Sequence, residues 1–377
     1  SPINTYGGLS GTCLNDSLPP GPSGLPDKIT RWFDGAEPTP NTGYYGAGAR
    51  GPGGTGSNSI FKADFAAETL ASVPATLSAS KYSRAFIQSS NAGYFVGGGY
   101  PFVNTCDKLT FATATNASTP GASCGTMYQQ VGNSGTPTAG YVMGGGGPSP
   151  ARSSYSYSIM NKITYSTDTR SALPGAVSHG TGHNPEKNMS NGGSGTDGTN
   201  GYWYWGEDGG YYRSFVEKST FATDTMSQLP ATVPNSPIVS FATASASTFS
   251  LLVGGPAGKS YASKFTFATE TMASPTGQLT TGVNNAAGQS NEAAGWFSGG
   301  GSPGFGITNM QKYTFSTDTV TDISGMRYPN PGVWLHRGGG DRNVHYGGSI
   351  TLPPTATPTP PTTLTGPEGI KAEGYLI

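Results

Sequence analysis

The stretch with the densest potential for binding chemistry runs from Tyr202 to Arg213. It reads Tyr-Trp-Tyr-Trp-Gly-Glu-Asp-Gly-Gly-Tyr-Tyr-Arg, so aromatic rings stand beside two carboxylates and a guanidinium group. In a sugar site, rings stack on the apolar face of a pyranose while charged groups hydrogen-bond its hydroxyls. The residues that this chemistry selects as ligand-binding are Trp203, Trp205, Glu207, Asp208, Tyr211, Tyr212 and Arg213.

The first part of this stretch also has a purely structural interpretation. Successive side chains on a β-strand point to opposite faces. Alternation therefore places Tyr202 and Tyr204 on one face and Trp203 and Trp205 on the other, where all four are expected to pack against neighbouring sheets. Residues 207–213 then fall in the loop that follows the strand, at the rim, and carry the ligand hypothesis.

Histidines offer a second candidate site, because His179 and His183 stand in a His-Gly-Thr-Gly-His sequence with Glu186 nearby. A metal site needs a third or fourth donor held by rigid structure, and this segment is rich in glycine. We therefore predict no metal and no cofactor. His336 and His345 are expected to be packing or rim residues.

Composition excludes several classes of protein. The net charge is −1 and there is no basic stripe, so the electrostatic footprint of a nucleic-acid-binding protein is missing. No apolar run reaches the ~20 residues that span a bilayer, and no signal peptide is recognised. Three cysteines are too few for a disulfide scaffold. Cys106 and Cys124 flank one repeat and are a candidate disulfide pair, in which case Cys13 would remain unpaired.

These candidates lie in a chain built from an internal repeat. Residues 312–319 read Lys-Tyr-Thr-Phe-Ser-Thr-Asp-Thr, and close copies begin at Lys62, Lys108, Lys162, Lys218 and Lys264. Successive lysines are 46, 54, 56, 46 and 48 residues apart. The acid of each copy, absent only where Ala114 stands, is interpreted as part of the construction of the repeat, with its side chain capping backbone amides in a turn.

Each copy is the third of four short strands in a unit of about 50 residues. An apolar strand ending in glycines precedes it, as at residues 93–99, 140–146, 251–255 and 295–301. An earlier strand is predicted at residues 29–33, 84–88, 127–131, 238–242 and 333–336, and a fourth follows the turn. Four-stranded antiparallel units repeated radially form an all-β propeller.

The blade count depends on the ends of the chain. Residues 333–336 and 344–346 are predicted to form the first two strands of a seventh blade, completed by residues 3–6 and 16–19 from the N-terminus. Strands from both termini would then close the ring without an open edge. We expect seven blades over residues 1–350, with six as the alternative.

The repeat resembles the kelch family. Double glycines at Gly97-Gly98 and Gly144-Gly145, and the third-strand aromatics Phe111 and Tyr165, match that family's pattern, whereas its fourth-strand Trp is absent. The repeat is similar to kelch-like propellers in virion proteins of marine and cyanobacterial phages. The copper site of kelch oxidases is not reproduced, and neither a sialidase Asp-box nor a nucleophile elbow is found, so we do not expect an enzyme.

The C-terminal segment, residues 351–377, is a Pro/Thr-rich linker that ends in an apolar peptide. It is interpreted as a tail that docks on other virion or surface-assembly proteins. The resemblance and the tail together imply a non-enzymatic structural or host-recognition part of a virion, such as a tail fibre, appendage or decoration, that binds glycans and forms a homo-oligomer. The alternative is a secreted or cell-surface kelch-type lectin or adhesin, so the expected location is virion or extracellular.

Overall fold

The computed structural model describes the chain between Thr42 and Gly348, with gaps. The described residues are 42–50, 55–81, 85–98, 104–124, 131–144, 160–173, 192–205, 207–208, 211–212, 214–233, 242–255, 260–283, 286–291, 293–298, 301–302, 305–306, 310–327, 333–334, 342–343 and 347–348. Within them the regular structure is β-strand, apart from one 3₁₀ turn at Pro120–Ala122. No helix in this part of the chain is long and apolar enough to cross a membrane.

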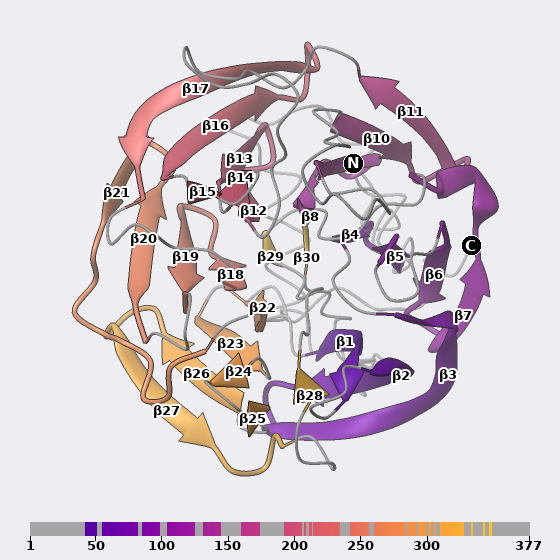
Figure 1. Ribbon diagram of the computed structural model, residues 1–377, viewed down its shortest axis with the longest axis horizontal. Helices are drawn as coiled ribbons and strands as arrows, with labels where there is room; N and C mark the ends of the chain where they lie inside the picture. The colour runs from indigo at the N-terminus through magenta and orange to yellow at the C-terminus, as the bar shows by residue number, and fades with distance from the viewer. Residues whose placement is uncertain are drawn as a thin grey trace, which may run out of the picture. The chain divides into compact units, whose positions relative to one another are not determined.

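Six antiparallel sheets of four strands each form a β-propeller (Figure 1). Blade 1 contains β28 (Val333–Trp334), β1 (Thr42–Arg50), β2 (Thr55–Asp64) and β3 (Thr69–Lys81), and blade 2 contains β4 (Ala85–Gln88), β5 (Ala92–Val96), β6 (Cys106–Thr110) and β7 (Thr115–Ser118). Blade 3 contains β8 (Val131–Gly135), β9 (Ala139–Met143), β10 (Met160–Thr164) and β11 (Thr169–Leu173).

The remaining three blades follow the same order of strands. Blade 4 contains β12 (Gly193–Thr196), β13 (Asn200–Tyr204), β16 (Phe215–Thr220) and β17 (Thr225–Thr232), and blade 5 contains β18 (Ala242–Ser245), β19 (Phe249–Val253), β20 (Ala262–Thr266) and β21 (Thr271–Ala273). Blade 6 contains β22 (Ala287–Ser290), β23 (Ala294–Ser298), β26 (Met310–Thr314) and β27 (Thr319–Ile323). The predicted all-β propeller is confirmed.

The second and third strands follow the predicted sequence pattern. The second strands β5, β9 and β23 are buried throughout, which matches their continuous apolar sequence. The third strands β6, β10 and β26 alternate between buried and half-buried residues, with the repeat lysine at a half-buried position. After β5 the chain passes through Gly97 and Gly98 at φ 66° and 135°, which explains the glycine pair.

Four of the first strands, β8, β12, β18 and β22, are rich in Gly, Ala and Ser, whereas β4 contains Phe86 and Ile87 and lies where it was predicted. The expected segments 127–131 and 238–242 share only Val131 and Ala242 with β8 and β18, and the rest of each lies outside the described residues. Neighbouring first strands approach closely: a Cβ at Gly132 would lie 2.6 Å from the Ala85 Cβ. Small size, rather than apolar character, is therefore what these four innermost strands share.

Blade 6 packs directly against blade 1, so the described residues form a ring of six blades, the alternative count, and the expected seventh blade is not found among them. The Trp296 ring of blade 6 stacks on Phe65 of blade 1 with centroids 4.0 Å apart. In the same interface, Lys312 forms an ion pair of 2.7 Å with Glu68. These contacts repeat those between other neighbouring blades, so they leave no place for a further sheet between blades 6 and 1.

Strand β28 lies in blade 1 and does not begin a seventh blade. Val333 pairs with Arg50 and Trp334 with Ala49, on the side of β1 opposite β2. The C-terminal part of the chain thus completes the first blade, where residues 29–33 were predicted. Those residues, the predicted N-terminal strands at 3–6 and 16–19, and the tail 351–377 lie outside the described residues.

A short hairpin follows β28 and lies inside the ring. It consists of β29 (Arg342–Asn343) and β30 (Gly347–Gly348), whereas a second strand was expected at residues 344–346. β30 contacts the first strands β4 and β8, and β29 contacts β18 and β22 (Figure 1). The chain therefore crosses the space enclosed by the innermost strands.

The ring closure permits a direct ranking of two interactions. Trp296→Ala is expected to lower the free energy of unfolding by about 3–5 kcal/mol, because it leaves a cavity in the closing interface. Lys312→Met is expected to cost at most about 1 kcal/mol, because partly exposed ion pairs contribute little. Urea unfolding followed by circular dichroism compares the two variants, and a larger loss in Lys312→Met would show that the ion pair dominates this interface.

Candidate functional site

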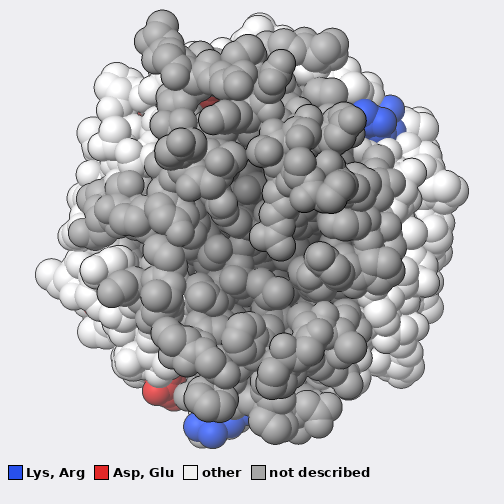
Figure 2. Space-filling model, viewed as in Figure 1, with Lys and Arg blue, Asp and Glu red and all other residues white. Residues whose placement is uncertain are grey.

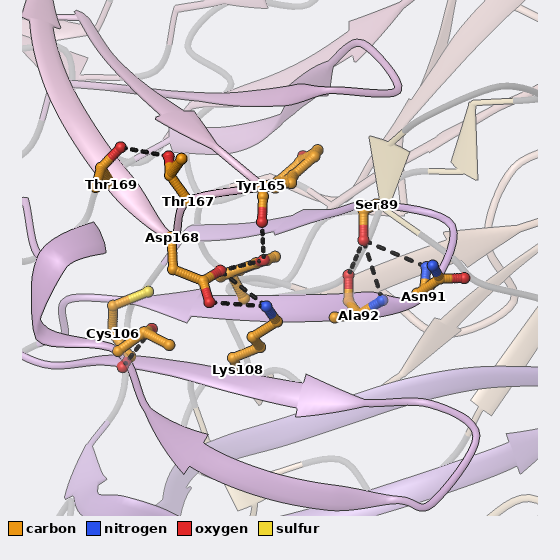
Figure 3. Close-up of polar contacts among 11 residues, drawn as sticks. Ser89, Asn91, Ala92, Cys106, Lys108, Tyr165, Thr167, Asp168 and Thr169 are labelled. Carbon is orange, nitrogen blue, oxygen red and sulfur yellow. Dashed lines mark hydrogen bonds and ion pairs between the residues drawn. The ribbon is translucent and has the colours of Figure 1, made fainter.

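The lysine and acid of the repeat form links between neighbouring blades. Lys108 of β6 contacts both carboxylate oxygens of Asp168, at 2.9 and 2.8 Å, and Asp168 belongs to the turn of blade 3 (Figure 3). The Tyr94 hydroxyl donates to the same carboxylate at 2.7 Å. Burial, and then the hydrogen bond to Asp168, raise the pKa of Tyr94, so its hydroxyl stays protonated and remains a donor.

The same arrangement recurs around the ring. Ion pairs join Lys162 to Asp224 at 2.9 Å, Lys218 to Glu270 at 2.6 Å and Lys312 to Glu68 at 2.7 Å. In each case the acid comes from the following blade and takes a left-handed φ between 51° and 52°. The structural interpretation of this lysine and acid is confirmed, but the carboxylate binds the neighbouring blade, whereas amide capping within the turn was predicted.

Two interfaces depart from this pattern. In blade 5, Lys264 lies 4.1 Å from the Phe249 ring centroid, and Asp318 of blade 6 accepts a hydrogen bond from Tyr313 at 3.0 Å. Between blades 1 and 2 the acid is replaced by Ala114, which keeps the left-handed φ of 51°. The repeat therefore retains its backbone at every turn while the side chain changes.

The aromatic stretch in β13 packs on both faces of blade 4, as predicted. Tyr202 and Tyr204 belong to one apolar cluster with Phe265 and Phe267 of blade 5. Trp203 and Trp205 belong to another with Tyr141 of blade 3. Both tryptophans are 0–1% exposed, so their rings serve as core and do not face solvent.

Four of the five remaining predicted ligand residues lie on a hairpin inserted between β13 and β16. β14 (Glu207–Asp208) pairs with β15 (Tyr211–Tyr212), which brings Glu207 opposite Tyr212 and Asp208 opposite Tyr211. Arg213 lies outside the described residues. The structure thus brings four of the seven predicted residues together on one two-stranded ribbon.

Trp205 and Phe215 close the base of this hairpin. The Trp205 backbone N–H donates to the Phe215 carbonyl at 3.2 Å, and the two rings lie 4.6 Å apart. The Trp205 indole N–H donates to Glu217 at 2.8 Å. Trp205 therefore anchors the ribbon to the propeller, a positioning role that the sequence pattern did not separate from ligand contact.

Glu217 is a buried acid that the sequence analysis missed. Burial raises its pKa to about 8, and the hydrogen bond from Trp205 opposes that rise. Its second oxygen, Oε1, has no hydrogen-bond partner among the residues that the structure describes. It stands directly before the repeat lysine Lys218, just outside the repeated sequence pattern, at a position that the sequence analysis did not consider.

The two cysteines that the structure describes form no disulfide. Cys106 and Cys124 are both buried, and the candidate bridge between them is not present. Burial, with a smaller contribution from Cys106, raises the pKa of the Cys124 thiol to about 12. Cys13 lies outside the described residues, as do His179, His183, Glu186, His336 and His345. Within the described segments, no group of three or more His, Cys, Asp or Glu side chains is placed to hold a metal ion.

Few charged side chains are visible among the described residues of the face shown in Figure 2. Lys and Arg or Asp and Glu form only small patches there, and the other described atoms belong to uncharged residues.

The chain was compared with family models and with curated proteins. No family model matches the chain, and no curated protein matches it either.

The buried Glu217 predicts how stability depends on pH. Between its ordinary pKa of 4.5 and the raised value of about 8, the unfolded chain loses this proton while the folded protein keeps it. The free energy of unfolding should therefore fall with rising pH, by up to about 1.4 kcal/mol per unit, and level off above pH 8.

Glu217→Gln removes this contribution because an amide does not ionise. The variant should lose this part of the slope, and its advantage over the wild type should grow from pH 5 to pH 8. Urea unfolding at pH 5, 6.5 and 8 measures both proteins. Identical slopes would contradict a proton held on Glu217.

Proposed function

We propose that this protein is a non-enzymatic recognition component that binds carbohydrate through the β14–β15 hairpin. The observation that carries the proposal is the register of this ribbon, which sets Glu207 opposite Tyr212 and Asp208 opposite Tyr211. Acids and phenols in adjacent positions supply the hydrogen-bonding and ring-stacking groups that a sugar requires. The anchored base at Trp205 and Phe215 favours recognition, because a ligand then binds without first ordering the ribbon.

The hairpin is also a departure from the repeat, which supports a role beyond construction. Blade 6 has a ribbon at the equivalent position, β24 (Gly301–Ser302) with β25 (Phe305–Gly306), in which the acids and the Tyr pair are missing. In blades 2, 3 and 5 no such ribbon is found among the described residues. Loops that vary on a constant scaffold are the usual carriers of binding function.

We place the protein in a virion, docked on other particle proteins through residues 351–377 and assembled as a homo-oligomer. The kelch-like repeat, the low charge and the Pro/Thr-rich tail support this proposal. The same features fit a secreted or cell-surface kelch-type lectin or adhesin, which has no particle to dock on. The location of the protein separates these two functions, and the glycan proposal is independent of it.

Carbohydrate binding is tested on a glycan array with the full chain. Wild-type protein is expected to bind a defined set of glycans, and Tyr211→Ala with Tyr212→Ala is expected to weaken binding at least about tenfold, since it removes both hairpin rings. Phe305→Ala in the blade 6 ribbon is the matched control and should retain binding. If the wild type binds no glycan, or the Tyr variant binds as tightly, the hairpin is not a sugar site.

The assembly proposal predicts where the protein is found. Immunogold microscopy of cultures that express the native gene should place the label on particles, and deletion of residues 351–377 should release the protein from them. Label on cell surfaces or in the medium, without particles, would favour the lectin or adhesin. Label retained on particles after the deletion would contradict the tail as the docking segment.

A further inference from the structure

One interface of the propeller lacks a carboxylate that its neighbours contain. At the interfaces of blades 2 with 3 and 3 with 4, a second-strand tyrosine and the lysine opposite it on the third strand bind one acid of the following blade. The acids are Asp168, bound by Tyr94 and Lys108, and Asp224, bound by Tyr141 and Lys162.

The interface of blades 1 and 2 has the same tyrosine and lysine. Tyr44 and Lys62 lie opposite each other in the register of β1 and β2, as Tyr94 and Lys108 do in β5 and β6. Tyr44 stacks on Phe111 of blade 2 at 5.4 Å, close to the 5.2 Å between Tyr94 and Tyr165. The rings and strands are therefore set as they are at the next interface.

Only the acid is missing. Ala114 takes the turn position with φ 51°, against 52° for Asp168, so the backbone follows the same path. Alanine is disfavoured in this left-handed conformation, whereas aspartate tolerates it better. The geometry of the turn does not explain why alanine stands there.

The missing carboxylate leaves two groups unpaired. Tyr44 is 2% exposed, and its hydroxyl has no hydrogen-bond partner among the residues that the structure describes. Lys62, which is exposed, forms no ion pair with any described residue. A buried hydroxyl without a partner is unfavourable and calls for a ligand or water to satisfy it.

We propose that Tyr44, Lys62 and the turn at Ala114 form a binding site for a carboxylate group. The ligand is a small carboxylic acid or the side chain of an Asp or Glu on a partner. Its oxygens would accept a hydrogen bond from the Tyr44 hydroxyl and contact the Lys62 ammonium group, as the Asp168 carboxylate does with Tyr94 and Lys108. The site does not depend on the glycan-binding hairpin.

The other departure from the pattern does not create such a site. Between blades 5 and 6 the acid Asp318 is present and accepts a hydrogen bond from Tyr313, while Lys264 lies over the Phe249 ring. Between blades 4 and 5, Lys218 pairs with Glu270, and the Tyr202 hydroxyl donates to Asp197. Within the described residues the vacancy is confined to Ala114.

Lysine reactivity tests the proposal in the full chain. Limiting acetic anhydride modifies amines, and peptide mass spectrometry gives the rate at each lysine. Sodium formate, compared with sodium chloride at equal ionic strength, is expected to slow modification of Lys62 about threefold once it exceeds twice its Kd. Lys108 and Lys162 already hold acids and should be unaffected, so they are internal controls.

Ala114→Asp places the carboxylate on the chain itself. Lys62 should then react more slowly without formate, and formate should add no protection. Ala112→Asp puts the same charge two residues earlier on the same exposed turn and should keep the wild-type response. A second readout is the melting temperature, which Ala114→Asp is expected to raise by roughly 1–4 °C.

The source of the carboxylate is distinguished by a second probe, N-acetyl-aspartic acid amide. Protection by both probes supports an acidic side chain of a partner, and protection by formate alone supports a small acid. Any one of three results would overturn the proposal. The first is that formate protects Lys62 no better than chloride, and the second is that it protects Lys62 and Lys108 equally. The third is that formate protects Lys62 as strongly in Ala114→Asp as in the wild type.

Discussion

The contact on which the rest of the structure depends is the one between an aromatic ring of a second strand and the turn ring of the next blade. It occurs at all six interfaces: Tyr44 with Phe111, Tyr94 with Tyr165, Tyr141 with Phe221, Tyr202 with Phe267, Phe249 with Phe315, and Trp296 with Phe65. Centroid separations between 4.0 and 5.4 Å set the spacing of neighbouring sheets. Each blade contributes one ring to the interface on each of its two sides, so every ring has a partner only when the blades form a closed ring.

The ion pairs lie around this apolar contact and depend on it. At four interfaces the lysine Nζ lies 5.4–5.9 Å from the centroid of the second-strand ring. The same ammonium group forms the ion pair with the acid of the next blade. Their side chains are about one-third exposed, so solvent screening keeps their contribution small. The aromatic packing is therefore expected to contribute more to the stability of these interfaces than the ion pairs, which favour the correct alignment of neighbouring blades.

A second polar position connects the blades on the opposite face of the third strand. The residue before the repeat lysine is buried in blades 2 to 6, as Asp107, Asn161, Glu217, Ser263 and Gln311. Asp107 accepts the amide of Ser78, in the fourth strand β3 of blade 1, and Gln311 accepts the amide of Thr281, after the fourth strand β21 of blade 5. The partners differ in other blades, since Asn161 accepts from the Arg170 side chain and Glu217 from the Trp205 indole.

The sequence alone determined the repeat, the second to fourth strands of each unit and the packing role of Tyr202 to Trp205. These follow from periods that are local, namely the alternation of a strand and the recurrence of Lys-x-Thr-Phe. It also placed Glu207 to Arg213 in a connection after the second strand, where the hairpin is found.

Only the tertiary structure decided the blade count, the partner of each acid and the vacancy at Ala114. The number of blades follows from the closure of blade 6 on blade 1 through Trp296 and Lys312, a contact between residues far apart in the chain. Two innermost strands, β8 and β18, were displaced in the prediction because they consist largely of small residues, which suit close approach and carry little apolar signal. Ala114 is a small difference between copies in the sequence, and it becomes an unfilled site only once Tyr44 and Lys62 from another blade are seen beside it.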